Sequence, residues 1–233
     1  MIVGSGLLAR AFSEAFAGAN DVLVYAAGVS NSSCADVREF DRERERLERA
    51  LAEAGKAETF IYFSTCSVAD PESSGTAYVR HKLAMEIVAR AHPGHLVLRL
   101  PQVAGKTPNP HTLLNYLYAR ISRGERFAIW GGARRNIIDV ADVARIAELL
   151  VRGGGGVKPA RGETINIANA RDYAVREIVQ MLERVTGKRA ILDVVARGGA
   201  YAVDIGRIRP LLSAAGVSFD ETYLERVLRK YYG

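Results

Sequence analysis

The sequence predicts an α/β protein built on a doubly wound parallel sheet, and two observations lead to this prediction. Short apolar runs, suited to strands that are buried on both faces, alternate with helix-length segments along the chain. The first of these runs, Ile2–Val3, passes directly into a pair of glycines. With 233 residues, of which 48% are hydrophobic and 25% charged, the chain is large enough for one globular core.

The first half of the chain predicts regular alternation of strands and helices. After the short strand Ile2–Val3, strands are expected at Asp21–Ala27, Thr59–Ser64 and Leu96–Leu100. Helices are expected at Leu7–Phe16, Asp36–Ala54 and Tyr78–Ala91. Gly55 is typical of a residue that closes a helix, Thr76 of one that caps a helix start, and Pro93 of one that prevents further extension.

The second half is less regular. A proline-rich loop, 106–110, precedes an expected helix at His111–Arg123, and Gly153–Gly156 is expected to be a flexible link. One further strand is expected at Thr164–Ile167. The remaining expected helices are Asp142–Val151, Val175–Thr186 and Tyr223–Tyr231.

Charge and composition narrow the range of partners. The net charge of +6 and the sequence pI of about 9.4 favour an anionic partner, such as a diphosphate. The arginines are spread along the chain, and the alternating signs of 42–46 indicate a solvated helix face, so we expect no nucleic-acid partner.

The sequence also predicts the location of the protein and the absence of disulfides and metal sites. No apolar run approaches the roughly 18 residues that cross a bilayer, and the N-terminal residues do not resemble a signal peptide. We therefore expect a cytoplasmic protein with no membrane partner. Cys34 and Cys66 are too few for a disulfide framework, and no His or Cys cluster has metal-ligand spacing, so no metal is expected.

A glycine turn is the first candidate for a functional motif. Gly4-Ser5-Gly6-Leu7-Leu8-Ala9 has the pattern G-x-G-x-x-A between a strand and a helix. Glycine lets the backbone approach a pyrophosphate, and the helix N-terminus supplies free N–H groups and partial positive charge. The alternative is an ordinary strand-to-helix turn. The position of the glycine motif after the first strand favours dinucleotide binding, by Gly4, Ser5, Gly6, Leu7 and Leu8.

Two further motifs carry hydroxyl and amine groups. The i, i+4 spacing places Tyr78 and Lys82 on one helical face, where an ammonium and an oxidised nicotinamide would lower the pKa of the phenol. Ser64 and Thr65 end a predicted buried strand, at the sheet edge where ligands bind in open α/β sheets. A hydroxyl there could share a proton with Tyr78. Taken alone, each motif also has an ordinary structural explanation.

The order of these motifs resembles that of the short-chain dehydrogenase/reductase superfamily, specifically its extended, NAD-dependent epimerase/dehydratase branch. Similar segments continue downstream at 98–105, 130–143 and 162–167. The resemblance implies a Rossmann-like fold, a catalytic set of Thr65, Tyr78 and Lys82, and NAD or NADP as cofactor. It implies that Ala27, Gly28, Ser64, Pro101 and Val103 also lie at the cofactor, together with Tyr78 and Lys82.

The same resemblance implies a substrate and an assembly. The substrate is a nucleotide-activated sugar, contacted by Thr65, Gln102, Trp130 and Arg135. Arg135 suits a diphosphate because a guanidinium matches phosphate oxygens in geometry, although a surface salt bridge is the alternative. Trp130 could stack on the nucleotide base or belong to the core. A homodimer is implied, paired through the helices Asp36–Ala54 and Tyr78–Ala91.

The chain departs from the family in its cofactor half. The strand Asp21–Ala27 resembles the family's fourth strand but follows the first helix directly, so about 40 residues, the size of two strand–helix units, are absent. The missing second strand would carry the acidic residue that binds the adenosine ribose, which leaves NAD or NADP open. A cofactor-free, ligand-binding descendant of the fold is therefore an alternative.

A second departure narrows the reaction. Sugar 4,6-dehydratases of this branch carry Thr-Asp-Glu where this chain has Thr65-Cys66-Ser67, and neither Cys66 nor Ser67 replaces a carboxylate pair. We therefore expect C4 epimerisation or keto-reduction, with a reductase of a non-nucleotide carbonyl as the alternative enzyme. Cys66 is expected to be an inert buried thiol. We expect one domain, 1–233, with a cofactor-binding core of 1–105 and 136–168 and a substrate-binding part of 106–135 and 169–233.

Overall fold

The core of the protein is a five-stranded parallel sheet. The structure is a computed structural model that describes residues 1–55 and 57–233. The strands stand in the order β1-β2-β3-β4-β8, and all neighbouring pairs are parallel. Their bounds are Ile2–Val3 for β1, Val22–Tyr25 for β2, Thr59–Thr65 for β3, His95–Leu100 for β4 and Glu163–Asn166 for β8.

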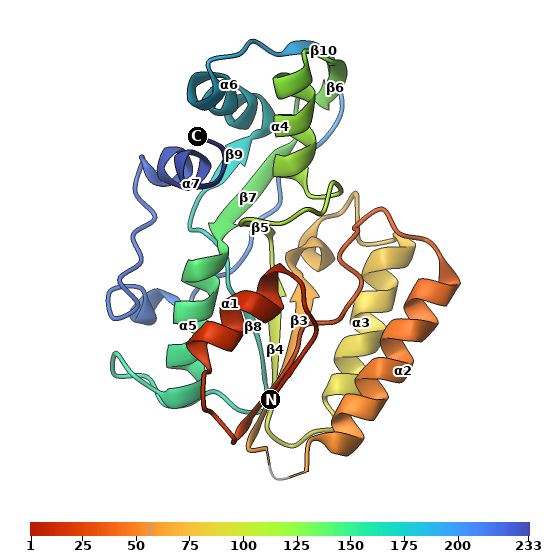
Figure 1. The fold of residues 1–233 in the computed structure, drawn as a ribbon, viewed down its shortest axis with the longest axis vertical. Coiled ribbons are helices and arrows are strands. Elements are labelled where there is room, and N and C mark those ends of the chain that lie inside the picture. Colours follow the sequence, from red (N-terminus) through yellow and green to blue (C-terminus); the bar gives the residue numbers. More distant parts are fainter. Residues whose placement is uncertain (56) are drawn as a thin grey trace.

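Helices cover both faces of this sheet, as the sequence predicted for a doubly wound fold (Figure 1). Helices α1 (Leu7–Ala15) and α5 (Val140–Arg152) pack on one face. Helices α2 (Val37–Glu53) and α3 (Ala77–Ala89) pack on the other. Side chains alternate along β2: Val22 and Val24 join the first core, whereas Leu23 and Tyr25 join the second. This alternation explains why strands buried on both faces read as continuous apolar runs.

The shortened cofactor half is a real feature of the fold. β1 pairs directly with β2, with Val3 opposite Tyr25, and no strand in the described part of the chain lies beyond β1. The two strand–helix units that the family places between α1 and this strand are therefore missing from the sheet. The α/β prediction with an incomplete Rossmann-like sheet is confirmed.

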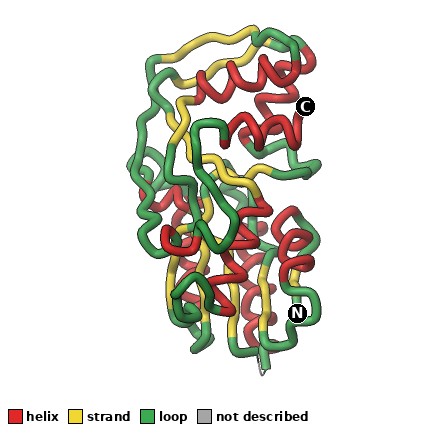
Figure 2. The backbone as a smooth tube through the Cα atoms, turned by 90° about the vertical axis from the view of Figure 1, so that its left-hand side faces the viewer, coloured by secondary structure: helices red, strands yellow, loops and turns green. Residues whose placement is uncertain are grey.

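A smaller body of helices and short strands sits above the carboxyl edge of the sheet (Figures 1 and 2). It contains the strands β5 (Gln102–Ala104), β6 (Arg126–Trp130), β7 (Arg134–Asp139), β9 (Asp172–Ala174) and β10 (Ile191–Val195), and the helices α4 (Leu113–Arg123), α6 (Val175–Thr186) and α7 (Tyr223–Tyr232). Its strands form a three-stranded sheet, β5-β7-β9, and a parallel pair, β10-β6. A separate apolar cluster fills its interior.

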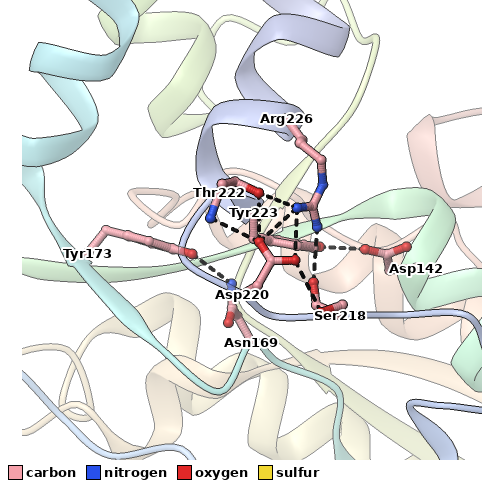
Figure 3. Close-up of polar contacts among 8 residues, drawn as sticks. All are labelled: Asp142, Asn169, Tyr173, Ser218, Asp220, Thr222, Tyr223 and Arg226. Carbon is pink, nitrogen blue, oxygen red and sulfur yellow. Dashed lines mark hydrogen bonds and ion pairs between the residues drawn. The ribbon is translucent and has the colours of Figure 1, made fainter.

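The last helix, α7, is tied to the rest of the molecule by one buried and one exposed set of polar contacts (Figure 3). The Tyr223 hydroxyl donates to Asp142 Oδ2 at 2.6 Å and accepts from the backbone N–H of Asp139 at 2.9 Å. Near the start of the helix, Arg226 forms a two-oxygen ion pair with Asp220. Burial raises the pKa of Tyr223, so its phenol remains a donor.

Most predicted elements are present, and the corrections have local causes. Helix α4 begins at Leu113 rather than His111, because Thr112 Oγ1 accepts the N–H of Asn115 and caps it. Helix α5 begins earlier than expected, at Val140, because the Asp139 side chain caps it. Gly154 and Val157 form an isolated bridge, so the glycine segment is a turn. The strands of the smaller body were not predicted, because they pair with segments that are distant in the sequence. None of the helices in the described residues is long and apolar enough to cross a bilayer.

Candidate active site

A cavity of about 320 Å³ opens at the carboxyl edge of the parallel sheet. The ends of β3 and β4, the start of α1, the loop after β2 and helix α3 all contribute to its walls. Among the predicted site residues, those that line it are Gly6, Leu7, Leu8, Gly28, Ser64, Thr65, Tyr78, Lys82, Pro101, Gln102 and Val103. Residues nearly 100 positions apart therefore meet at this edge, because parallel strands all end there.

Tyr78 reaches the cavity from the first turn of α3. The helix starts at Ala77, one residue before the predicted start, and Thr76 is its cap as predicted: Thr76 Oγ1 accepts the backbone N–H of Val79 at 3.3 Å. The phenol is 9% exposed. Burial raises the pKa of Tyr78, the Glu43 carboxylate raises it further, and a hydrogen bond with Thr65 lowers it. In the protein by itself the pKa of Tyr78 is therefore raised, and the expected lowering by Lys82 together with an oxidised nicotinamide stays a prediction.

Lys82 lies one turn further along α3, and its ammonium is engaged by a carboxylate. Lys82 Nζ is 3.0 Å from Glu43 Oε1 and 4.5 Å from the centre of the Tyr62 ring. The side chain is only 3% exposed. Burial lowers the pKa of Lys82, and Glu43 opposes that change. The ammonium therefore sits in an ion pair at the floor of the cavity.

The hydroxyl-bearing end of β3 has two different roles. Thr65 Oγ1 accepts the N–H of Ser67 at 3.1 Å, which caps the short helix Cys66–Ala69, and the side chain faces Tyr78. Ser64 also lines the cavity, but its hydroxyl donates to Glu86 Oε1 at 2.6 Å. Glu86 is held in turn by two hydrogen bonds from Arg99. Thr65 therefore keeps its O–H donor for Tyr78 or a ligand, whereas the O–H donor of Ser64 is already used.

The glycine turn has the conformation that its sequence suggests. Gly4 has φ of +126°, and a Cβ there would collide with the Ala26 carbonyl, so only glycine fits. Gly6 precedes α1 without a capping side chain, and a Cβ on it would meet nothing within 4 Å. No side chain caps the first turn of α1, and Gly6, Leu7 and Leu8 line the cavity. Three other residues predicted to bind the cofactor lie outside the cavity lining: Gly4, Ser5 and Ala27.

Only some of the predicted substrate-binding residues line the cavity. Gln102 lines the cavity. Trp130 is 38% exposed on β6, under the Arg197 guanidinium at 4.5 Å, and is not part of the lining. Arg135 donates to the Arg134 carbonyl at 2.7 Å and also lies outside the lining, although it is near enough to the lining residue Tyr201 to influence its pKa.

Several residues of this site were not predicted from the sequence. Glu43 was assigned to a solvated helix face, but it is 2% exposed, whereas its neighbours Arg42 and Arg44 are exposed. Spacing could have identified it, because Glu43, Leu47 and Ala50 recur on one face of α2. The loop residues Asn109 and His111 also line the cavity, together with Ser30, Ser32, Thr107, Thr112 and Tyr201.

Among the described residues, the cavity lining offers neither a reactive thiol nor a carboxylate. Cys66 is buried, it donates to the Arg99 carbonyl at 3.3 Å, and burial raises the pKa of its thiol to about 12. No aspartate or glutamate is among the described residues that line the cavity. The titratable groups at its surface are therefore phenols, the Lys82 ammonium and His111.

Comparisons with known proteins agree with this architecture. The model of the NAD dependent epimerase/dehydratase family matches residues 7–168. The UDP-glucuronic acid 4-epimerase of Bacillus cereus is similar in structure, with a TM-score of 0.72, 22% identity, and coverage of 91% of this chain and 74% of that one. A comparison with curated proteins found no match.

Two other solved structures have the same fold. The dTDP-glucose 4,6-dehydratase of Bacillus anthracis matches with a TM-score of 0.68, 16% identity, and coverage of 91% and 71% of the two chains. RMD of Pseudomonas aeruginosa matches with a TM-score of 0.66, 19% identity, and coverage of 90% and 79%. The family match spans more than half of the sequence, and it contains strands β2, β3, β4 and β8 and the Tyr78–Lys82 helix; β1 and the glycines of the turn come directly before it. The chain belongs to the NAD dependent epimerase/dehydratase family.

Proposed function

We propose that this protein is an NAD(P)-dependent enzyme that epimerises or reduces a nucleotide-activated sugar at C4, with Tyr78 as the acid/base. One observation carries the proposal: the hydroxyls of Tyr78 and Thr65 and the ammonium of Lys82 converge on one cavity at the carboxyl edge of the sheet. Membership of an epimerase/dehydratase family supports an enzyme over a purely ligand-binding protein. In this proposal Thr65, Tyr78 and Lys82 are the catalytic residues.

The residues at the glycine turn fit a dinucleotide. The close approach at Gly4, the open space at Gly6 and the free first turn of α1 suit the phosphates of NAD or NADP. Solved relatives contain either NAD or NADPH, as in the B. cereus epimerase and the P. aeruginosa protein. The cofactor, when bound, supplies hydride transfer at its nicotinamide ring. Gly28, Ser64, Pro101 and Val103 would surround that ring.

The protein's own groups would manage the proton. Tyr78 is a phenol whose pKa is raised in the free protein, so it is held as a proton donor for reduction. To accept a proton in the oxidative direction, it needs a nearby positive charge, and the charged ring of an oxidised cofactor and Lys82 are the available sources. Thr65 would hold the same sugar oxygen by hydrogen bonding and orient it toward the phenol.

The lining of the cavity favours epimerisation or keto-reduction over dehydration. Water elimination needs an acid and a base at the reacting carbons. The described lining has no carboxylate, and the Cys66 thiol, with its pKa raised to about 12, is a poor substitute. Oxidation and reduction at one carbon need a cofactor to take and return the hydride and, from the protein, only one acid/base with a hydroxyl partner, roles that Tyr78 and Thr65 would fill.

The substrate would occupy the space between the sheet edge and the smaller body. Gln102 is placed to contact the sugar, and Arg135 and Trp130 would join the site only if the ligand extends beyond the cavity lining. The B. cereus epimerase is solved with UDP-glucuronic acid, which supports a nucleotide sugar as the ligand class. We assign cofactor binding to 1–105 and 136–168, and substrate binding to 106–135 and 169–233. We also propose that the enzyme acts in the cytoplasm.

Substitution of the phenol tests the proposal. Purified protein is incubated with NAD and a panel of UDP- and dTDP-sugars, and C4 epimers are separated by chromatography; keto-sugar reduction is followed with NADH and NADPH. We expect turnover in the parent and a loss of at least a thousandfold in Tyr78→Phe at an unchanged melting temperature. Tyr173→Phe, a matched change in a buried phenol of the smaller body, should keep its activity.

Two outcomes would contradict the proposal. Activity of Tyr78→Phe within tenfold of the parent would remove the phenol from the reaction. Failure of the parent to bind NADH or NADPH at millimolar concentration would instead favour a ligand-binding protein that has kept the fold without the chemistry.

A further inference from the structure

The buried carboxylate of Glu43 touches four groups from three directions. Its Oε1 accepts hydrogen bonds from the Tyr62 hydroxyl at 2.7 Å and from Lys82 Nζ at 3.0 Å. Its Oε2 accepts the backbone N–H of Val29 at 2.6 Å and lies 3.0 Å from His81 Nε2. Helix α2 thus reaches β3, helix α3 and the loop after β2 through one side chain.

The surrounding atoms leave this carboxylate little freedom. The Glu43 side chain is only 1% exposed, and Phe40, one turn earlier in α2, stacks on the His81 ring at 4.3 Å. A Cβ on Gly28 would lie 2.7 Å from Glu43 Oε1 and 3.0 Å from Lys82 Nζ, so the glycine lets the loop pass directly over the ion pair. A buried charge with every oxygen occupied holds a fixed position.

The ion pair with Glu43 constrains the Lys82 ammonium but leaves it an N–H donor for a ligand. An ammonium has three N–H donors, one of which goes to Glu43, while the Tyr62 ring covers another side at 4.5 Å. Lys82 also lines the cavity. At least one donor can therefore point at a ligand there.

We propose that Glu43 is a positioning residue of the catalytic centre: its carboxylate fixes the Lys82 ammonium at the cavity floor and keeps it protonated. This inference rests on the proposed function, because it presumes that Lys82 acts in the reaction. The ionisable groups that face Lys82 are Glu43 from α2, Tyr62 from β3, and Tyr78 and Glu86 from α3. Of these, only Glu43 combines negative charge with direct contact.

The first experiment measures the Lys82 proton directly, without turnover. The chain has six lysines, so the ¹³Cε resonances of labelled lysine can be resolved and Lys82 assigned with Lys82→Arg. We expect Glu43→Gln to lower the titration midpoint of Lys82 by at least one pH unit. Glu86→Gln is the matched control: it removes a neighbouring buried carboxylate that holds Arg99 but does not contact Lys82, and it should move the midpoint by less than half as much.

Activity supplies the second readout. In Glu43→Gln we expect kcat to fall 10- to 100-fold with KM within threefold, and the alkaline limb of the pH–rate profile to move to lower pH. Glu43→Asp, which keeps the charge on a shorter side chain, should give an intermediate midpoint and partial recovery of kcat. A Lys82 midpoint in Glu43→Gln and Glu43→Asp within 0.3 unit of the parent would overturn the inference.

The parent protein alone gives an independent check if the variants do not fold. An ammonium fixed in a buried ion pair exchanges its protons slowly, so a Lys82 ¹⁵Nζ resonance should be visible at neutral pH, and its absence would also overturn the inference. The two proposals fail separately. An active Tyr78→Phe would remove the proposed function but leave the Lys82 titration result standing.

Discussion

At the scale of single residues, the site depends on groups whose charge states are set by burial and by one partner. The Tyr78 phenol is kept protonated, whereas Glu43 is kept ionised. Burial would raise the pKa of Glu43, but Lys82 and hydrogen bonds from His81, Val29 and Tyr62 outweigh it and lower that pKa to about 2. If Glu43 positions Lys82 as proposed, the same ion pair affects both catalysis and stability.

This lowered pKa predicts a specific acid sensitivity. A carboxyl with an ordinary value of 4.5 in the unfolded chain and about 2 in the folded protein stabilises the fold above pH 4.5, and that stabilisation is lost as pH falls from 4.5 to 2. The contribution is at most about 3 kcal/mol. Urea unfolding at several pH values should show that the free energy of unfolding falls less steeply with decreasing pH in Glu43→Gln than in the parent. Glu48→Gln, an exposed change on the same helix, should follow the parent.

At the scale of elements, helix α3 carries two of the three proposed catalytic residues. Tyr78 and Lys82 share one face because they are one turn apart, and Thr76 determines where the first turn begins. Helix α2 lies beside α3 and supplies Glu43 (Figure 1). Both helices start at a side-chain cap: Thr76 accepts from Val79, and Asp36 accepts from Arg38.

These two caps give a matched pair of variants. Thr76→Ala and Asp36→Ala should each cost about 1 kcal/mol, because each leaves a helix N–H without its partner. We expect only Thr76→Ala to lower turnover, by about threefold to tenfold, because the α3 cap lies two residues before Tyr78. Thermal denaturation and initial rates measure both effects. Equal losses of activity in the two variants would show that general destabilisation, not the position of Tyr78, is responsible.

At the scale of the whole molecule, the sheet has lost its outer cofactor-binding strands. β1 pairs with β2, and no strand of the described residues continues beyond it. In complete dinucleotide folds, the next strand carries the acid that recognises the adenosine ribose. In the proposed binding mode the nicotinamide half lies at the cavity, so the two halves of a dinucleotide would be held unequally.

This asymmetry predicts unusual cofactor selectivity. Affinities for NADH and NADPH should differ by less than about threefold, since the acidic residue that separates them is missing. Reduced nicotinamide mononucleotide, which lacks the adenosine part, should bind within tenfold of NADH. Fluorescence titration measures all three. A preference above tenfold for one dinucleotide would reveal a selective adenosine site made by other residues.

The outer faces of α2 and α3 predict an assembly. Val37 and Ile87 are 65% and 69% exposed, which leaves apolar side chains in water on the two helices. A homodimer paired through them would cover these residues. Sedimentation should give a dimer for the parent and a monomer for Ile87→Glu. Ile191→Glu, a change of the same kind at a 43% exposed position on β10, should remain dimeric. A monomeric parent would contradict the prediction.

The sequence by itself determined the α/β class, the strands and helices of the central sheet, the shortened cofactor half and the Tyr78–Lys82 pair. These features depend on local patterns: uninterrupted apolar runs, a glycine that alone tolerates its conformation at Gly4, and helical spacing. The family match and the position of β1 next to β2 confirm the fold prediction.

Only the tertiary structure decided which polar residues meet. Glu43 lies among arginines and glutamates that resemble a solvated face, yet packing of α2 on α3 buries it against Lys82. Trp130 and Arg135 belong to a segment similar to the family pattern, yet they lie outside the cavity lining. The short strands of the smaller body also depend on distant partners. Local sequence sets which face of an element a residue occupies, but burial depends on what packs against that face.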